Sequence, residues 1–454
     1  MKMIEKLITN STSKNILFLG KLINLTPKEI ESFLEKEGLN FCQSYEEDKD
    51  YAFVVLSSLI NPYEEEISYE VYNRGIKDIK LEQFEAYYIS KIKPNSLLMS
   101  IKLKNDKDRI LRLLNLNCID DSLYLKLLNL YKWEEGSVFD SNSNRDVTIS
   151  FIKRFLPTRA NVNHNEIVHS PASLLEIALI CQNRDVLKSM LKFPKYELRS
   201  RGKEDWKPKE LKEFIATNES IDNEIIEVLL NLNNSRIDTL LALNCALNQK
   251  HLETIYNRTS HQGKINLTKN SNLTDELFKK LLDSEVKKEL LNNQIITKNR
   301  LALIKEDDLI YLSNNSNISE IIDEILFKNR DLDFALGQNI ALNSNKLQML
   351  YKKYGNNIAI NLSKNPNTPK ELLKEFFKLD SWDIKLNLAT NPSTPIEILD
   401  TLCQMNNREL NLHLATNESV RDEYLEFFKV DNELLRALSK NKKFLKNMEK
   451  KAII

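Results

Sequence analysis

The residue types that most often perform chemistry in proteins are sparse in this sequence of 454 residues. His164 and His169 lie on either side of Glu166 in a polar stretch, a spacing that a metal ion or a proton shuttle can use. No Cys or carboxylate cluster on a periodic segment completes a coordination set, so an exposed histidine pair is the simpler interpretation. The remaining histidines occur singly: His251, His261 and His413.

The cysteines are odd in number and far apart, without a CxxC pair or a Cys/His pairing at metal spacing: Cys42, Cys118, Cys181, Cys245 and Cys403. They are interpreted as small buried hydrophobic residues in a reducing compartment. With 8 Gly, the chain has little material for a phosphate loop, and neither a nucleophile elbow nor paired carboxylates stand out. The sequence therefore predicts a protein that is not an enzyme, with no catalytic, cofactor-binding or metal residues.

A lysine cluster near the C-terminal end is the strongest local charge: Lys440, Lys442, Lys443, Lys446, Lys450 and Lys451. Such a cluster can bind phosphates. Cations at the end of a last helix also complement its dipole and keep the end of a repeat array soluble. Because Lys plus Arg and Asp plus Glu number 65 each, no global field attracts nucleic acid, and we favour the structural role.

The elements that position these residues include a repeat in the C-terminal half. The segments NLSKNPNTPKELLKEFFKLD (361–380) and NLATNPSTPIEILDTLCQMN (387–406) share nearly every apolar, Asn and Pro position. An anchoring Asn recurs every 22 to 26 residues: Asn218, Asn244, Asn270, Asn293, Asn315, Asn339, Asn365, Asn391, Asn417 and Asn441. An apolar residue stands three positions before each anchor: Ile215, Leu241, Leu267, Leu290, Leu312, Leu336, Leu362, Leu388, Leu414 and Leu438.

A second apolar column stands eight positions after the anchors, from Ile226 to Leu425, and Asp323 interrupts it. Thr368-Pro369 and Thr394-Pro395 are typical of an N-cap followed by Pro at the first helical position. Each unit is therefore predicted to be a short helix, a turn and a longer helix, stacked on its neighbours. We interpret the Asn column as structural, with its amides satisfying turn backbone groups.

NPNTPKELL and ATNPSTPIEIL resemble the leucine-rich repeat variant family over about the last 240 residues. The resemblance implies a right-handed solenoid that alternates α and 3₁₀ helices. Some members carry an N-terminal cysteine-rich iron–sulfur segment. This sequence provides no such ligands, so no cofactor is expected.

Residues 13–95 predict a small α/β domain with a parallel sheet: strands at 16–20, 51–56 and 76–81, and helices at 26–37, at 64–74 and from 82. FLGKL, EKEGLNF, DYAFVVLSS and NRGIKDIKLEQFEAYY resemble a BRCT domain. Phosphopeptide-binding members place Ser or Thr before the first-strand Gly and Lys at the start of the second helix. Leu19 and the run Glu64-Glu65-Glu66 stand there, so we do not expect phosphate binding. Phe84 is the expected aromatic core anchor.

Residues 96–205 predict a helical connector that caps the array. Leu114 to Leu125 resembles a decayed repeat around Asn117, residues 133–145 read as a loop, and 170–191 as two short packed helices. The array itself is assigned to residues 206–454. Charged or polar residues interrupt every apolar stretch, so neither a signal peptide nor a spanning helix is expected, and we predict a cytoplasmic location.

The fold expected is mostly α: a right-handed α-solenoid of short helical repeats preceded by a small α/β (BRCT-like) domain. Its function is predicted to be a non-catalytic protein-interaction scaffold that uses the two parts as separate binding modules. The sequence leaves open the protein partner, the solenoid face and the oligomeric state. One alternative is a DNA-maintenance factor that binds DNA ends through the N-terminal domain, and another is an enzyme whose site only the folded chain assembles.

Overall fold

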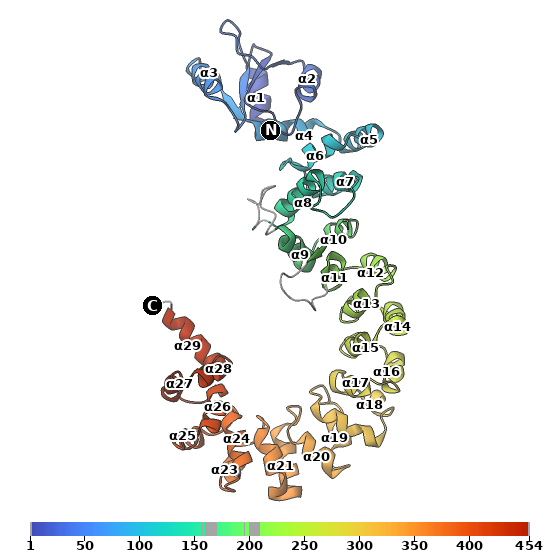
Figure 1. Cartoon of the computed structure of the whole chain (residues 1–454), viewed down its shortest axis with the longest axis vertical. Helices are drawn as coiled ribbons and strands as arrows, with labels where there is room; N and C mark the ends of the chain where they lie inside the picture. Colours follow the sequence, from blue (N-terminus) through green and yellow to red (C-terminus); the bar gives the residue numbers. More distant parts are fainter. Residues whose placement is uncertain (1, 157, 159–169, 195, 199–208, 453–454) are drawn as a thin grey trace. The chain divides into compact units, whose positions relative to one another are not determined.

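A computed structural model of the chain describes residues 2–156, 158, 170–194, 196–198 and 209–452 (Figure 1). These residues form 29 α-helices and, near the N-terminus, a four-stranded parallel sheet. The expected mostly α chain with one small α/β region is therefore confirmed. Residues 1–237 and 238–454 form two compact units, which are described separately.

The N-terminal α/β domain, called the head below, consists of α1 (Lys2–Asn10), β1 (Asn15–Leu19), α2 (Pro27–Lys36), β2 (Asn40–Cys42), β3 (Phe53–Leu56), α3 (Pro62–Asn73), β4 (Asp78–Lys80) and α4 (Leu81–Lys91). The strands pair in the order β2-β1-β3-β4. The expected parallel sheet is confirmed. Helix α1 lies before the residues in which the domain was expected. Strand β2 was also not expected, because its three residues are too few to show an alternating pattern.

The head has helices on both faces of its sheet, because alternate side chains of each strand point to opposite faces. On one face Phe18 of β1 packs with Phe33 of α2 and Phe84 of α4. Phe84 is fully buried, which confirms it as a core residue. On the other face Leu17 packs with Ile67 of α3.

The connector is helical in its described parts: α5 (Pro94–Lys104), α6 (Lys107–Leu114), α7 (Asp121–Leu130), α8 (Asn142–Phe155), α9 (Ser170–Ile180) and α10 (Arg184–Met190). The first unit continues with β6 (Lys209–Glu210), which pairs with β5 (Glu197–Leu198), and with α11 (Leu211–Ala216) and α12 (Asn223–Leu230), which belong to the residues assigned to the array. Helices α9 and α10 are the two short helices expected at 170–191.

Two expectations for the connector are wrong. The loop predicted for 133–145 ends early, because the Ser141 hydroxyl caps the N-terminus of α8. Asn117 is exposed and anchors no decayed repeat. The Leu114 carbonyl instead accepts a hydrogen bond from the Ser150 hydroxyl at 2.7 Å, so α8 satisfies the end of α6.

The boundary between the two units lies within α13 (Ser235–Leu241), and the second unit is helical from there on. Its elements are α14 (Gln249–Arg258), α15 (His261–Leu267), α16 (Asp275–Leu282), α17 (Lys287–Asn293), α18 (Lys298–Leu301), η2 (Glu306–Asn314), α19 (Ile322–Ile325), α20 (Arg330–Leu336), α21 (Ser344–Tyr354), η3 (Gly355–Ile358), α22 (Ala359–Lys364), α23 (Lys370–Phe377), α24 (Trp382–Thr390), α25 (Ile396–Gln404), α26 (Arg408–Thr416), α27 (Asp422–Phe428), α28 (Asn432–Leu438) and α29 (Lys442–Ala452). Helices α22, α24, α26 and α28 pack on one another in that order (Figure 1).

We call one helix that ends at an anchor, together with the turn and the helix that follow it, a coil. A ladder of side-chain amide hydrogen bonds joins consecutive coils. Asn391 Nδ2 donates to the Ser363 and Asn365 carbonyls at 2.8 and 2.9 Å, and Asn417 repeats the pattern on Ala389 and Asn391. Each coil from Asn270 to Asn441 forms such bonds, at 2.6 to 3.1 Å, with Gln294 as the donor in the coil where Asn293 was expected. The structural interpretation of the Asn column is thereby confirmed.

One anchor was assigned to the wrong residue. Gln294, not Asn293, donates to the Thr268 and Asn270 carbonyls, and Asn293 donates to the Thr268 hydroxyl. The apolar column three positions before the anchors is fully buried in all ten members from Ile215 to Leu438. In the second apolar column Asp323 is exposed and Ile322 is buried instead, so this coil is shifted by one residue.

The two threonines predicted as N-caps have a different role. Thr368 Oγ1 and Thr394 Oγ1 donate to the Leu362 and Leu388 carbonyls, both at 2.7 Å, so they cap the end of the preceding helix. The expected contrast of a short and a longer helix holds in α20 and α21, with 7 and 11 residues, and in α22 and α23, with 6 and 8, whereas α24 and α25 are both nine residues long. Most helices that end at an anchor are α-helical, and η2 is 3₁₀.

Leu388→Ala should destabilise the second unit by roughly 2 to 5 kcal/mol, because Leu388 is fully buried in α24 between α22 and α26. Hydrogen exchange should accelerate across about residues 360–420, since neighbouring coils share the lost contacts. Exchange in β1 to β4 is the control and should not change. Equal loss of protection in the sheet would mean that the chain unfolds as one cooperative body.

Asn391→Asp should destabilise more than Asn391→Ala at pH 7, although Asp is the closer isostere. The carboxylate keeps the acceptor for the Ser393 N–H but faces two carbonyl oxygens in a buried site, which raises its pKa above the unfolded value. The extra loss of unfolding free energy is fully present at pH values above the pKa of the introduced carboxyl in the folded state. It disappears as pH falls below the pKa of the same carboxyl in the unfolded chain. Urea unfolding at pH 7 and pH 4, relative to wild type, measures this difference, and the same loss at both pH values would contradict it.

Candidate functional site

The histidine group suggested by the sequence cannot be placed, because His164, Glu166 and His169 lie outside the described residues. Within the described ranges no cluster of three or more His, Cys, Asp or Glu side chains could hold a metal ion. His251 is buried; its backbone N–H donates to Asn248 Oδ1 at 3.0 Å, and its ring Nδ1 accepts the Asn248 N–H at 3.4 Å. His413 Nδ1 lies 2.9 Å from the Thr390 hydroxyl. These two rings serve contacts within or between neighbouring coils.

The turn after β1 and the start of α3 present backbone N–H groups that an anion could use. Gly20 has φ +89°, and a Cβ there would lie 2.7 Å from the Leu59 carbonyl oxygen, so the turn requires glycine. Glu64 Oε1 accepts the Gly20 N–H, and its Oε2 accepts the Asn61 N–H at the start of α3, both at 2.9 Å. Leu19 is buried. The carboxylate of the chain's own Glu64 therefore uses the donors that an external anion would need.

The head also has an exposed cleft of about 330 Å³ between α3 and the β4 edge of the sheet. Its apolar lining comes from Val54, Leu56 and Ile76. Tyr69 and Tyr72 stand one helical turn apart at its rim and are 65% and 70% exposed. Tyrosine rings exposed beside an apolar cleft are typical of protein interfaces.

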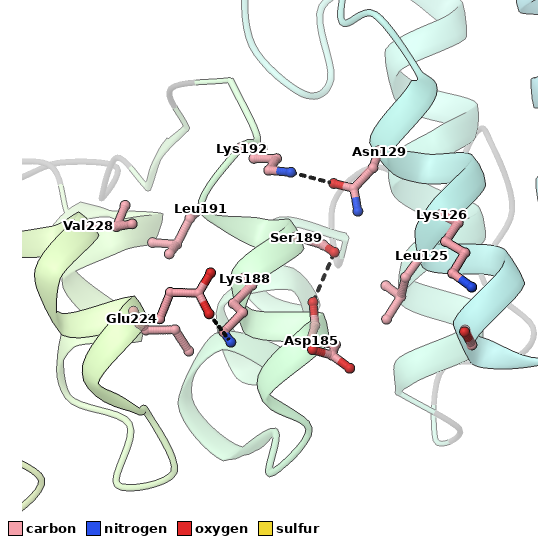
Figure 2. Close-up of a pocket in the computed structure, with 12 residues that line it drawn as sticks. Leu125, Lys126, Asn129, Asp185, Lys188, Ser189, Leu191, Lys192, Glu224 and Val228 are labelled. Atoms are coloured by element: carbon pink, nitrogen blue, oxygen red, sulfur yellow. Dashed lines mark hydrogen bonds and ion pairs between the residues drawn. The ribbon is translucent and has the colours of Figure 1, made fainter. Parts of the chain in front are cut away.

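A larger groove, with an apolar floor and a polar rim, lies between α7, α10 and α12 in the first unit and has a volume of about 410 Å³ (Figure 2). Leu125, Leu191 and Ile225 form its buried floor. At the rim Lys192 Nζ donates to Asn129 Oδ1 at 2.9 Å, and Lys188 pairs with Glu224 (Figure 2).

The groove suits binding better than catalysis. The hydrogen bond to Glu224 raises the pKa of Lys188, so its amine stays charged and is no nucleophile at neutral pH. The Ser189 hydroxyl donates to the Asp185 carbonyl, as an ordinary helical side chain does. Sequence reasoning missed this groove because its walls come from three segments up to 106 residues apart, Ser122 to Val228, which show no shared pattern.

The C-terminal lysines are partly structural. Lys443 Nζ donates to the Val420 carbonyl at 2.9 Å and pairs with Asp422 at 2.8 Å. The same kind of bond to the preceding coil is made by Asn367 to the Leu342 carbonyl and by Arg300 to the Leu273 carbonyl. Lys443 thus belongs to the contacts between coils. The side chains of Lys450 and Lys451 lie outside the described set.

The cysteines differ more than expected. Cys42 and Cys403 are buried, which confirms the prediction for these two residues. Cys118 and Cys181 are only half-buried and Cys245 is exposed, so the prediction is wrong for Cys245 and holds only in part for the other two. Burial raises the pKa of the Cys403 thiol to about 12 and that of Cys118 to about 11. All five are free thiols.

No helix in the described part of the chain is long and apolar enough to cross a membrane. Comparison with protein-family models, with curated proteins and with solved structures found no match. The functional argument therefore rests on the residues of this chain.

Alkylation of the native protein should distinguish the cysteines. Iodoacetamide at neutral pH should modify Cys245 first and Cys403 last, because a thiol pKa near 12 leaves roughly a thousandfold less thiolate than an ordinary one. Peptide mass spectrometry over time measures both sites in one sample. The denatured chain is the control, in which the two rates should converge. Early modification of Cys403 in the native chain would contradict its burial.

Proposed function

We propose that this protein is a non-catalytic protein-interaction scaffold, in which the helical repeats and the head bind separate partners. The observation that carries the proposal is the unbroken amide ladder from Asn270 to Asn441. It repeats one backbone geometry coil after coil, so equivalent side chains recur at regular intervals on a long surface. Extended surfaces of stacked repeats are binding surfaces in many proteins.

The repeats are proposed to form a right-handed α-solenoid of the leucine-rich repeat variant type. The NPxTP segments, the buried Leu column and the ordered packing of α22, α24, α26 and α28 support this assignment. The predominance of α-helices where that family alternates α and 3₁₀ is the main departure.

The head is proposed to be BRCT-like. Its strand order β2-β1-β3-β4, with α2 and α4 on one face and α3 on the other, supports the proposal. The Glu64 carboxylate on the Gly20 N–H argues against a phosphopeptide ligand. The cleft beside Tyr69 and Tyr72 is then the part of the head best suited to a protein partner.

The DNA alternative is less well supported. Residues 13–95 contain ten Lys and Arg against fifteen Asp and Glu, so this domain would repel phosphates. Lys443 is engaged by the preceding coil. The enzyme alternative lacks a lowered-pKa nucleophile in the groove between α7, α10 and α12. A cytoplasmic location remains part of the proposal.

Affinity capture from native lysate tests the two-module scaffold with the full-length chain. Tyr69→Ser with Tyr72→Ser should abolish capture of one subset of proteins and leave the others, because both rings are exposed and their loss spares the core. Val430→Ser, which removes an apolar side chain 86% exposed in the second unit, is the matched control. An unchanged protein set with the tyrosine variant would contradict a separate head module. Capture that disappears on nuclease treatment would favour DNA binding.

A further inference from the structure

A stripe of apolar side chains runs across consecutive coils of the second unit. It occupies the position five residues before the anchor in each coil: Ile310, Phe334, Ile360, Leu386 and Leu412. Ile310 and Ile360 are 36% and 41% exposed, and the other three are half-buried. Their helices are η2, α20, α22, α24 and α26. Helix η2 packs on α20, α22 on α24 and α24 on α26, and the bond from Asn365 Nδ2 to the Gly337 carbonyl joins the end of α22 to that of α20.

The stripe is continuous only over these five coils. In the coils before them the same position holds Thr239, the isolated apolar Ile265 and then Glu289, and in the coil after them it holds Arg436. The buried Leu column continues through all these coils. Coil stacking therefore does not require an apolar residue at the stripe position, and another constraint must account for the five that occur there.

An acidic row runs along one side of the stripe, one helical turn earlier in each coil. Asp307, Asp331, Asp383 and Glu409 hold this position in four of the five coils, and Asn357 holds it in the fifth; all four carboxylates are exposed. Among the described residues Asp307, Asp331 and Asp383 form no ion pair. Glu409 accepts a hydrogen bond from Trp382 Nε1 at 3.1 Å.

Acidic residues in the first turn of a helix also stabilise the helix dipole, which is a sufficient reason for any one of them. That reason applies equally to the three coils before the stripe, where Arg236, Gln262 and Val286 hold the same position. The acidic row begins with the apolar stripe and continues one coil beyond it, to Glu433. The helix dipole does not explain why the row is absent from the three preceding coils.

We propose that the stripe and the acidic row together bind an amphipathic helix of a partner protein that carries Lys or Arg beside its apolar face. Charge complementarity selects a basic partner. Packed helices lie about 8 to 10 Å apart, and seven residues of an α-helix rise about 10.5 Å. A partner helix laid across the coils therefore presents one apolar residue to each coil per heptad. In an extended strand, side chains on one face repeat at intervals of about 6.8 Å, which is shorter than the spacing between packed helices.

The proposal rests on the scaffold function and names its partner chemistry. Two basic residues that adjoin the acidic row in the sequence are engaged by groups other than its carboxylates. The Arg330 guanidinium lies over the Phe334 ring at 5.2 Å, and Arg408 pairs with Glu433 of the next coil.

Fluorescence anisotropy with the full-length chain tests the proposal. The probe is a labelled 21-residue helical peptide with Leu at heptad positions a and d and Lys beside them; its comparators are a scrambled peptide and one with Glu for Lys. We expect the Lys peptide to bind in the micromolar range and to weaken as salt rises. Ile360→Ser with Leu386→Ser should weaken it at least tenfold, whereas Ile265→Ser, at the same position outside the stripe, should not.

Asp383→Asn with Glu409→Gln should weaken binding and reduce its salt dependence, because the charges are lost while the Trp382 contact keeps an acceptor. Circular dichroism of each variant confirms that it is folded. No binding of the Lys peptide at 100 μM, or equal binding by the stripe variant, would overturn the proposal. If the chain still captured proteins from lysate in that case, the scaffold function would stand without this surface.

Discussion

The carbonyl groups at the ends of short helices impose the constraint on which the second unit depends. The last carbonyls of a helix have no partner within it, and here they face the next coil, away from water. A donor from that coil must reach them. The Asn amide does so with two N–H groups, while its oxygen accepts an N–H of its own turn, as in the Ser393 N–H on Asn391 Oδ1. One side chain thus fixes both the turn and the distance between coils.

The coil without an Asn anchor shows that the requirement is a donor for the helix-end carbonyls, and not the Asn residue itself. Where the step between coils shortens, Gln294 takes the place of Asn, and its longer side chain reaches the Thr268 and Asn270 carbonyls. The Ile296 N–H, which is the turn donor expected for the side-chain oxygen, donates to the Asn317 carbonyl. Arg300 donates to Gln294 Oε1 in its place. Two side chains, Gln294 and Arg300, together form the contacts that a single Asn forms elsewhere.

Repetition decided how much of the fold could be predicted. The Leu and Asn columns were readable because ten coils solve one packing problem with the same residues. Thr368 was misassigned because a hydroxyl before Pro suits an N-cap equally well, and only the folded coil brings it to the Leu362 carbonyl. The Gly20 contact with Glu64 spans 44 residues, and the groove of Figure 2 joins three segments, so no local pattern reveals either.

The ladder also limits where binding specificity can lie. Positions that satisfy carbonyls or fill the space between coils cannot vary without loss of stability, so they are nearly uniform along the second unit. The position five before the anchor is not held to one residue type, and it changes from Thr239 to Ile360 to Arg436 along the chain. In a stack whose frame is uniform, such variable positions are the ones through which different coils can acquire different partners. A surface property that begins and ends within the frame is therefore better explained by binding than by folding.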